Sequence, residues 1–478
     1  MKLRELPEGF RSMLRSTCPG DVAEKLIGAL ETTEPSVSVL ANTLRGAAIA
    51  EGYDTVPLSS GAGAYLDGRP VFAADPAWHQ GLYYVQDASS MATSAAVGHI
   101  IKTYFGNTPL RYLDACAAPG GKTIAAIAQL PEGSAVLANE YDRKRAAILL
   151  ENLGRHGFLS VAVSSVDGAS LGSLGEIFDI VAVDAPCSGE GMMRKEPEAI
   201  RQWSPALVES CAATQRRILR GAWAALRPGG VFIYSTCTFN RMENEENVAF
   251  IADELGGESI ALPLGDFSGV LPGFSTEHHC YHFLPGFVRG EGLFIAAMRK
   301  PGGNAALPKM KAPQRAKDPS VAAFAAKAIK DSDCYTIIAF PNDSFSVIPE
   351  SQAPFFGHLH SKLRLLRCGL PLCRLKGKDI QPAWELAFST IFCNDAFPLL
   401  LLNREASLSY LHGDSLTDIP EGLEKGIVTA TYNGIPLGFA KNIGRRANNL
   451  YPEQLRLRMD PSTAAQQPPT AITKMKAI

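Results

Sequence analysis

Two cysteines in this sequence follow apolar stretches in the same manner. Cys237 comes shortly after a stretch of strand-forming residues, 231–234 (VFIY). Cys187 follows the apolar stretch 180–183 (IVAV), which ends at Asp184 and continues into a tight Ala-Pro-Cys-Ser-Gly loop. Open α/β sheets bind their ligands at the carboxyl ends of their strands. We therefore expect the two thiols and the carboxylate of Asp184 to meet at adjacent strand ends.

A glycine-rich loop, residues 116–123 (CAAPGGKT), follows another strand-like stretch and ends like a phosphate-binding loop. A Walker loop requires glycine five positions before the glycine of its Gly-Lys-Thr, and Cys116 stands there. The GxGxxG fingerprint of dinucleotide sites is also missing from this loop. Binding of a nucleoside triphosphate is therefore disfavoured.

The same loop fits a small cofactor that lies across the ends of successive strands. Gly120 and Gly121 permit a ligand to approach the backbone closely. Glu140, after the next strand-like stretch, can accept hydrogen bonds from both hydroxyls of a ribose, and Asp167 can accept one from an exocyclic amine. Each acid alone is more often a solvated strand end. Together, at successive strand ends, they favour an adenosine-binding site.

Strand-like and helix-like stretches alternate between residues 91 and 298, which is typical of an α/β fold with a parallel sheet and crossover helices. The strand-like stretches are 110–114, 135–139, 161–163, 180–184 and 231–234, with 287–298 expected as a final edge strand. The helix-like stretches are 91–105, a helix that the glycine-rich loop opens and that ends near Gln129, 143–156 and 206–226. Gln86, Asp87 and Ser89 precede the first of these helices, where they can cap it or contact the polar end of a cofactor.

The flanking segments carry weaker patterns. Residues 3–30 have helical periodicity, and residues 301–313, rich in Pro, Gly and Lys, indicate a linker. Residues 426–441 indicate a β-hairpin that turns at Asn433–Gly434. The tail after residue 458 is rich in Gln, Pro, Thr and Ala and is expected to be disordered.

The net charge is −2 over 478 residues, so any basic surface for a nucleic acid must be local. The ten cysteines are scattered without CxxC pairs, which favours a reducing compartment and no metal site. Residues 278–282 (HHCYH) are a weak metal candidate, because adjacent histidines of an extended segment point to opposite faces. Without a signal peptide or a long apolar run, we expect a cytoplasmic protein with no membrane partner.

Three segments carry a resemblance to a known family. Residues 114–123 (DACAAPGGKT), 184–191 (DAPCSGEG) and 235–239 (STCTF) resemble the signature motifs of the NOL/NOP/Sun family of RNA 5-methylcytosine methyltransferases. The resemblance spans about residues 78–300, and the full layout is similar to the bacterial RsmF type, which methylates 16S ribosomal RNA. Residues 434–441 (GIPLGFAK) more weakly resemble the PUA-like RNA-binding domain of that subgroup.

The resemblance implies a class I (Rossmann-like) S-adenosylmethionine-dependent methyltransferase and a role for each motif residue. Cys237 matches the cysteine whose thiolate adds to C6 of cytosine, which makes C5 nucleophilic enough to attack the methyl group. Cys187 matches the cysteine assigned to product release, either as the base or by positioning one. Asp184 matches the carboxylate placed at N3, where it could serve only if it carries or shares a proton. Lys122 matches the lysine of the family loop and can lower nearby thiol pKa values by its charge.

The resemblance also implies a cofactor site and an RNA surface. The S-adenosylmethionine site would comprise Cys116, Ala117, Ala118, Pro119, Gly120, Gly121, Lys122, Glu140, Asp167 and Asp184. The cationic residues available for RNA are Arg194, Lys195, Lys362, Arg364, Arg367, Lys441, Arg445 and Arg446. Spread over three segments, they would form an extended track for the RNA backbone.

The expected organisation has six parts: an α+β module (1–77), the catalytic domain (78–300), a linker (301–318), an RsmF-like domain (319–397), a PUA-like domain (398–458) and the tail (459–478). The expected partner is ribosomal RNA or the small ribosomal subunit, bound by a monomer. Two alternatives stay open, namely a tRNA cytosine-C5 methyltransferase and a catalytically silent RNA-binding assembly factor of the same fold. Intact motifs favour an enzyme over the silent factor.

Overall fold

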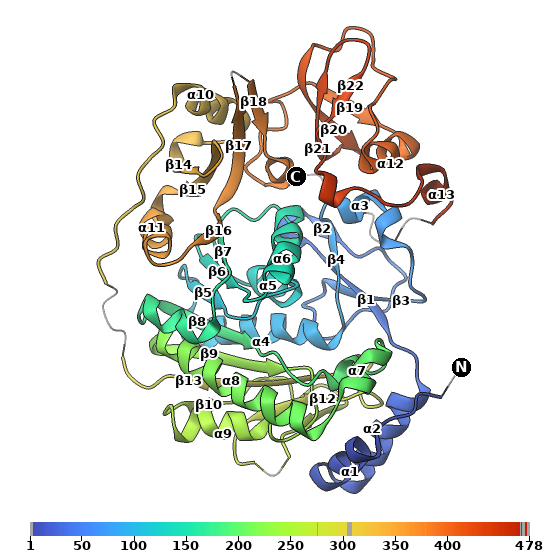
Figure 1. The fold of residues 1–478 in the computed structure, drawn as a ribbon, viewed down its shortest axis with the longest axis vertical. Coiled ribbons are helices and arrows are strands. Elements are labelled where there is room, and N and C mark those ends of the chain that lie inside the picture. Colours follow the sequence, from blue (N-terminus) through green and yellow to red (C-terminus); the bar gives the residue numbers. More distant parts are fainter. Residues whose placement is uncertain are drawn as a thin grey trace.

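Ten strands form one large sheet in the part of the chain that the computed structural model describes, which is residues 3–274, 276–303, 308–377, 379–468, 470 and 474–475 (Figure 1). Five of these strands are parallel, as the alternating pattern predicts, and they lie in the order β7, β6, β5, β8, β9. Their bounds are Val161–Ser164, Ala135–Asn139, Arg111–Asp114, Phe178–Asp184 and Leu226–Thr236. The chain runs outward from β5 through β6 and β7 and then returns to β8, so the strand order reverses between β5 and β8. Ligands of open α/β sheets bind at such a point.

The other strands extend the sheet at both edges. β13 (Leu293–Arg299) pairs with β9, β10 (Glu258–Ile260) and β12 (Cys280–Phe283), and β11 (Val270–Pro272) lies beyond β12. At the opposite edge, β16 (Leu365–Cys368) pairs with β7. The prediction of β13 as an edge strand is wrong, because the segment before it supplies further strands. Alternate residues of β13 pack into cores on both faces of the sheet, which explains its continuous apolar sequence.

Helices cover both faces of this sheet. α4 (Ala92–Ile100), α5 (Gly121–Ile127) and α6 (Arg143–Arg155) contribute to the core on one face. α8 (Pro205–Ala225) and α9 (Glu245–Asp253) contribute to the core on the other. A π-helical turn, Ile101–Phe105, extends α4 over the stretch that the sequence predicts as helical. The short helix α7 (Pro197–Gln202) precedes α8.

The N-terminal helical stretch is divided in two. α1 (Glu8–Thr17) and α2 (Gly20–Thr32) are separated at Pro19, whose extended backbone interrupts the helix. Both helices pack against Trp203 and Phe239 of the region that carries the cysteine motifs. The rest of the module has a sheet of β3 (Gly63–Leu66), β1 (Val37–Ala41) and β4 (Tyr83–Val85), with β2 (Ala47–Ala48) and α3 (Pro76–His79) beside it.

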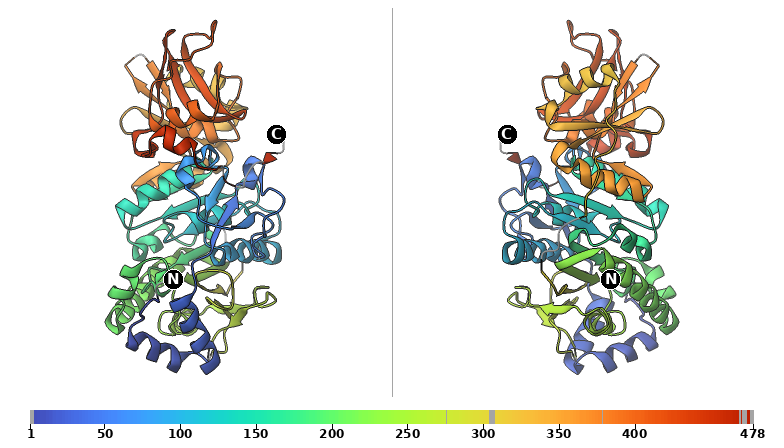
Figure 2. Two further views of the ribbon diagram at one scale, coloured as in Figure 1. Left: turned by 90° about the vertical axis from the view of Figure 1, so that its right-hand side faces the viewer. Right: turned by 90° about the vertical axis from the view of Figure 1, so that its left-hand side faces the viewer.

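Two further units lie at the end of the molecule opposite α1 and α2 (Figures 1 and 2). The first contains β14 (Tyr335–Phe340), β15 (Ser344–Pro349), β17 (Leu370–Lys376) and β18 (Asp379–Pro382), with α10 (Pro319–Ala328) and α11 (Ala353–Lys362). The second contains β19 (Leu399–Leu402), β20 (Gly426–Tyr432), β21 (Ile435–Asn442), β22 (Ala447–Asn449) and α12 (Arg404–His412). The predicted hairpin is confirmed: Asn433 (φ 50°) and Gly434 (φ 74°) form the turn between β20 and β21.

Part of the tail is ordered, although its composition predicts disorder. Asp460 caps α13 (Pro461–Ala465) by accepting hydrogen bonds from two backbone amides, and Ala464 is fully buried. The amide of Thr470 donates to Asp75, and β23 (Lys474–Met475) pairs with β2. Residues 304–307 of the expected linker, and 469, 471–473 and 476–478 of the tail, lie outside the described residues.

None of the helices in the described ranges combines the length and apolar character that a membrane span requires. The same ranges contain no group of three or more His, Cys, Asp or Glu side chains placed to hold a metal ion.

Candidate active site

The two cysteine-bearing loops meet where β8 and β9 end. These strands are parallel, with Asp184 opposite Ser235, so the loops that follow them start side by side. The Sγ atoms of Cys187 and Cys237 are 3.3 Å apart. The proximity that the sequence predicts for the two thiols and Asp184 is confirmed, whereas their chemical roles stay a prediction.

Asp184 lies between a lysine and a serine. Lys122 Nζ donates a hydrogen bond to its Oδ2 (2.8 Å), and Ser235 Oγ donates one to its Oδ1 (2.9 Å). Burial disfavours the charged form of Lys122, but the charge and hydrogen bond of Asp184 outweigh this and raise the pKa of Lys122 above its usual value. Lys122 is therefore an ammonium group, and Asp184 accepts hydrogen bonds on both of its oxygens.

Cys187 is the thiol that retains its proton. Its hydrogen bond to Cys237, its burial and the nearby charge of Glu243 raise the pKa of Cys187 well above the ordinary value. Cys187 therefore keeps its S–H group, which can donate to the sulfur of Cys237.

A buried carboxylate, Glu243, connects the two cysteine loops. Its Oε2 accepts hydrogen bonds from the amide of Ser188 (3.0 Å) and from Gln215 Nε2 (2.7 Å). Its Oε1 accepts one from Asn240 Nδ2 (2.8 Å), in the turn after Cys237. Glu243 is completely buried, so water does not compete for these bonds.

A second buried carboxylate, Glu190, also connects the two cysteine loops, this time from the Cys187 loop to the Cys237 loop. It stands in the Cys187 loop and accepts hydrogen bonds from the amides of Phe239 (2.6 Å) and Asn240 (3.1 Å), and from Trp203 Nε1 (3.0 Å). Reasoning from the sequence missed Glu190 and Glu243 as functional residues. The available signal was their position: Glu190 stands within the motif 184–191, and Glu243 follows the motif 235–239 by four residues.

We expect Glu243→Gln to disturb the spacing of the two thiols. The amide NH₂ of glutamine would face donor groups, leaving buried donors unpaired at a cost of about 1–3 kcal/mol. Displacement of a reacting group by about 1 Å can lower kcat roughly 10²-fold. Thermal unfolding and single-turnover methyl transfer would measure both effects. Glu246→Gln is the matched control, because its side chain is 44% exposed; equal losses in both variants would contradict a positioning role.

A cavity of about 840 Å³ lies in front of these groups at the carboxyl ends of the parallel strands. The sequence-predicted residues that line it are Cys116, Ala118, Pro119, Lys122, Glu140, Asp167, Asp184, Cys187 and Cys237. Ala117 and Gly121 line an adjoining cavity of about 160 Å³. Gly120 lines neither, and its φ of +112° turns the chain into α5 instead.

The lining of the cavity fits an adenosine cofactor at one end. Glu140 is 4% exposed, and its Oε2 lacks a hydrogen-bond donor among the described residues, although Arg145 Nη1 lies 3.5 Å away. A ribose hydroxyl would satisfy this oxygen. Asp167 is more engaged than the sequence suggests, because it caps the turn at Ala169 and forms a 2.7 Å ion pair with Arg217. It still faces the cavity, and each of its oxygens retains a free lone pair.

The segment before α4 fits both of the roles predicted for it, which are to cap the helix and to contact a cofactor. Asp87 accepts hydrogen bonds from the amides of Ser90 (3.3 Å) and Glu291 (3.0 Å), so it caps the helical turn and also lines the cavity. Gln86 is buried beside the smaller cavity, and both polar atoms of its amide lack partners among the described residues. A polar group of a cofactor would satisfy them.

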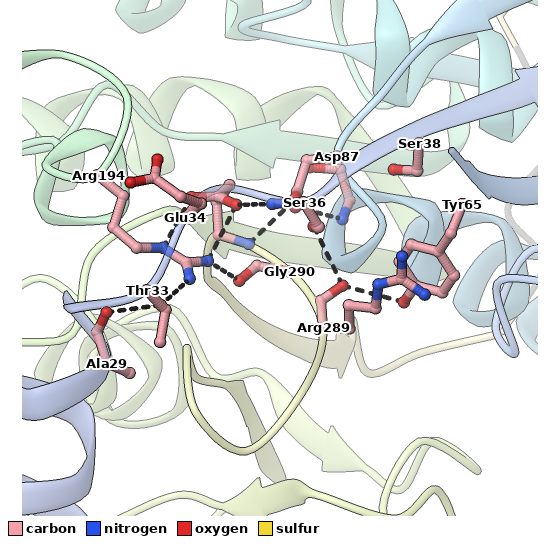
Figure 3. A network of polar contacts seen from close by, with 12 residues as sticks. Ala29, Thr33, Glu34, Ser36, Ser38, Tyr65, Asp87, Arg194, Arg289 and Gly290 are labelled. Atoms are coloured by element: carbon pink, nitrogen blue, oxygen red, sulfur yellow. Dashed lines mark hydrogen bonds and ion pairs between the residues drawn. The ribbon is translucent and has the colours of Figure 1, made fainter. Parts of the chain in front are cut away.

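The predicted cationic track is partly wrong. Arg194 is buried, and it donates to Glu291 (3.0 Å) and Thr33 (2.8 Å) instead of facing solvent (Figure 3). Arg367 is also buried and donates to the carbonyl of Gly369. Lys441 forms a 2.7 Å ion pair with Asp379 at the surface, where its side chain stays 44% exposed. The residues that retain exposed charges are Lys195, which lines the candidate active-site cavity, and Lys362, Arg364, Lys441, Arg445 and Arg446.

Comparisons of the sequence give matches along most of the chain. A family model described as 16S rRNA methyltransferase RsmB/F matches residues 107–299, and one described as methyltransferase RsmF PUA domain matches residues 397–457. The chain is 34% identical over 395 residues to the ribosomal RNA small subunit methyltransferase F of Klebsiella pneumoniae (strain 342), covering 78% of each protein. It is equally identical over 388 residues to the protein of that name from Salmonella heidelberg (strain SL476), with the same coverage.

Comparisons of the structure agree on the fold. A methyltransferase homolog protein from Pyrococcus horikoshii is 25% identical, with a TM-score of 0.51, and the match covers 62% of this chain and 95% of that one. NSun6 from the same organism, solved with the S-adenosylmethionine analogue SFG, is 22% identical with a TM-score of 0.52. That match covers 63% of this chain and 100% of the other. The large sheet and its helices thus have the class I methyltransferase fold.

Proposed function

The chain belongs to the RsmB/F family of 16S rRNA methyltransferases, S-adenosylmethionine-dependent enzymes, and we propose that it methylates C5 of a cytosine in 16S rRNA through a covalent thiolate adduct. The observation that carries this proposal is the pair of thiols, 3.3 Å apart, beside the Lys122–Asp184 ion pair. At this distance, one sulfur can add to the base while the other assists release of the product. The relatives named methyltransferase F support 16S rRNA as the substrate.

Cys237 is the attacking thiol in this proposal. Its thiolate adds to C6, and the charge that develops on the base spreads to N3. Lys122 is the proton donor at N3, because Asp184 is a hydrogen-bond acceptor on both oxygens. Asp184 holds the ammonium group in place and keeps it charged. The family resemblance suggests Asp184 as the group that carries the proton, whereas this assignment gives that role to its ion-pair partner, Lys122.

S-adenosylmethionine supplies the electrophilic methyl group when it is bound. Gln86 presents unpaired buried polar atoms at the smaller cavity and Glu140 one at the larger, and these atoms would hold its polar groups. After the methyl group is on C5, solvent water accepts the C5 proton. The electron pair left at C5 forms the C5–C6 double bond and expels the sulfur of Cys237 as a thiolate, and N3 returns its proton to Lys122. Cys187 assists this release by donating its S–H to the departing thiolate of Cys237.

The target base must leave its stack to reach the cavity. A cytosine in a duplex cannot present C6 to a buried thiol, so the substrate must be single-stranded or unstacked there. Residues 398–458 would then bind RNA away from the chemistry, with the exposed Arg445 and Arg446 contacting phosphates. The exposed Lys362 and Arg364 of the preceding unit would contribute in the same way.

Methyl transfer to defined RNAs tests the proposal. We expect the purified protein to place 5-methylcytidine at one position of 16S rRNA or of the small subunit, detected by mass spectrometry of nuclease fragments. Cys237→Ala should reduce transfer to background. Methylation of tRNA instead would identify the alternative substrate, and binding of ribosomal RNA without any transfer would indicate an assembly factor.

A further inference from the structure

A second cavity, of about 450 Å³, lies behind one wall of the catalytic cavity. The N-terminal module bounds it with residues 54–58 and Tyr65. The catalytic region bounds it with apolar side chains that include Phe267 and Phe287, and with Arg289. It is therefore a site between two parts of the chain, and the cysteines, Lys122 and Asp184 do not line it.

The wall between the two cavities consists of two short segments. In the first, Asp87 and Ser90 face the catalytic cavity, whereas Ala88 and Ser89 face the second one. In the other, Glu291 faces the catalytic cavity and Arg289, two residues earlier, faces the second. The two cavities therefore lie next to each other, and adjacent nucleotides of one RNA strand can occupy them.

Hydrogen bonds hold this wall in a defined position (Figure 3). The amide of Glu291 donates to Asp87 (3.0 Å), and Tyr65 Oη donates to the carbonyl of Arg289 (3.0 Å). The buried Arg194 donates to both Glu291 and the carbonyl of Gly290. The side chains on the two faces of the wall therefore have a fixed spacing.

The lining of the second cavity combines aromatic rings with a cation. The guanidinium of Arg289 lies 4.1 Å from the ring centroid of Tyr65, and both residues line the cavity. Arg289 also pairs with Asp54 at 3.2 Å, but both side chains are exposed, and a surface pair of this kind contributes little. A phosphate can therefore compete for the guanidinium.

One polar group at the wall lacks a partner. Ser89 is 3% exposed, and its Oγ makes no hydrogen bond within the described residues. A buried hydroxyl without a partner is costly and is satisfied when a ligand supplies a donor or acceptor. Nucleobases carry both kinds of group on their edges, together with a flat face that stacks on aromatic rings.

We propose that this cavity binds the nucleobase of an RNA nucleotide next to the target cytosine, with Tyr65 stacking on the base and Arg289 contacting its phosphate. The proposal rests on the proposed function, since it places the neighbouring nucleotide relative to a cytosine in the catalytic cavity. The enzyme would then read the sequence beside its target, and the pocket would hold the strand while the cytosine is turned inward.

The test combines a protein variant with a modified substrate. The target cytosine is mapped with the wild-type protein, and short RNAs are made with an abasic site at the 5′ or the 3′ neighbour. We expect Tyr65→Ala to raise KM about tenfold, equivalent to about 1.4 kcal/mol, with kcat and the affinity for S-adenosylmethionine unchanged. An abasic neighbour on one side should raise KM of the wild-type protein equally, and the two changes together should add nothing further.

Two further variants separate stacking from structural effects. Tyr65→Phe loses the hydrogen bond to Arg289 but keeps the ring, so it should retain most of the affinity. Tyr53→Ala is the matched control, because this exposed tyrosine of the same module does not line the cavity, and its KM should equal that of the wild type.

The proposed pocket would be overturned if Tyr65→Ala and the abasic site raised KM independently of each other, or if an abasic site on neither side changed KM. An equal rise of KM in Tyr53→Ala would also overturn it. Fluorescence anisotropy of labelled RNA measures the same pattern of affinities without chemistry. If the wild-type protein transferred no methyl group, the proposed function would fail, and anisotropy with unmodified 16S rRNA fragments would still decide the pocket by comparing the affinities of Tyr65→Ala and Tyr53→Ala.

Discussion

Cys187→Ala is expected to accumulate a covalent protein–RNA complex that survives a denaturing gel. The attacking thiol, Cys237, remains in this variant, so addition to C6 and methyl transfer proceed. Release slows because the departing thiolate loses the S–H donor that lies 3.3 Å from it. Loss of a positioned proton donor typically costs 10²–10⁴-fold in the step that it assists, so the adduct should become the main RNA-bound species.

Matched variants assign the two thiols. Cys237→Ala and the double variant should form no adduct and transfer no methyl group, whereas Cys334→Ala, which removes an exposed thiol outside the cavity, should behave as the wild type. An adduct that appears in Cys237→Ala and not in Cys187→Ala would exchange the two roles. Peptide mapping of the complex after nuclease digestion would identify the sulfur that is attached.

The meeting of Cys187, Cys237 and Asp184 could be predicted because it depends on sheet topology alone. Parallel neighbours such as β8 and β9 bring their carboxyl ends to one edge whatever loops follow them. The carboxylates that set the distance between the thiols could not be predicted in this way. Acidic residues in loops are usually solvated, and nothing in the local sequence shows that Glu190 and Glu243 are completely buried.

The sequence also could not predict the exposure of side chains whose partners come from distant segments of the chain. Arg194 looks like a free cation beside a catalytic loop, but Glu291, 97 residues later, pairs with it inside the protein. Arg367 contacts the carbonyl of Phe158, 209 residues earlier, because β16 joins the edge of the large sheet. In both cases the tertiary fold decides whether the charge reaches solvent, and periodicity cannot supply that information.

Lys122→Met is expected to lower kcat by about 10²–10⁴-fold, the usual range for removing a positioned acid. The change removes the donor at N3 while keeping a side chain of similar length. Single-turnover methyl transfer at saturating cofactor would measure the chemical step. A variant that kept more than a tenth of the wild-type rate would exclude Lys122 as the proton donor and return that role to Asp184.

Asp184→Asn is expected to move the alkaline limit of activity to lower pH. In the wild type, Asp184 raises the pKa of Lys122 above its usual value, whereas burial acts in the opposite direction. Without the carboxylate, burial dominates and the pKa of Lys122 falls. The ammonium form is the active donor, so activity is present below this pKa and lost as the pH rises through it. The variant should therefore lose kcat at a pH where the wild type still works.

The pH at which activity is lost, rather than the maximal kcat, reports on the pKa of Lys122. Ser235→Ala is the matched comparison, because Ser235 donates the other hydrogen bond to Asp184 and its removal leaves the charge of the ion pair intact. It should lower kcat without moving the alkaline limit. A limit that shifted equally in both variants would indicate a general disturbance of the site. A shift in Asp184→Asn alone would identify the ammonium group as the titrating acid, since the carboxylate acts on the base only through it.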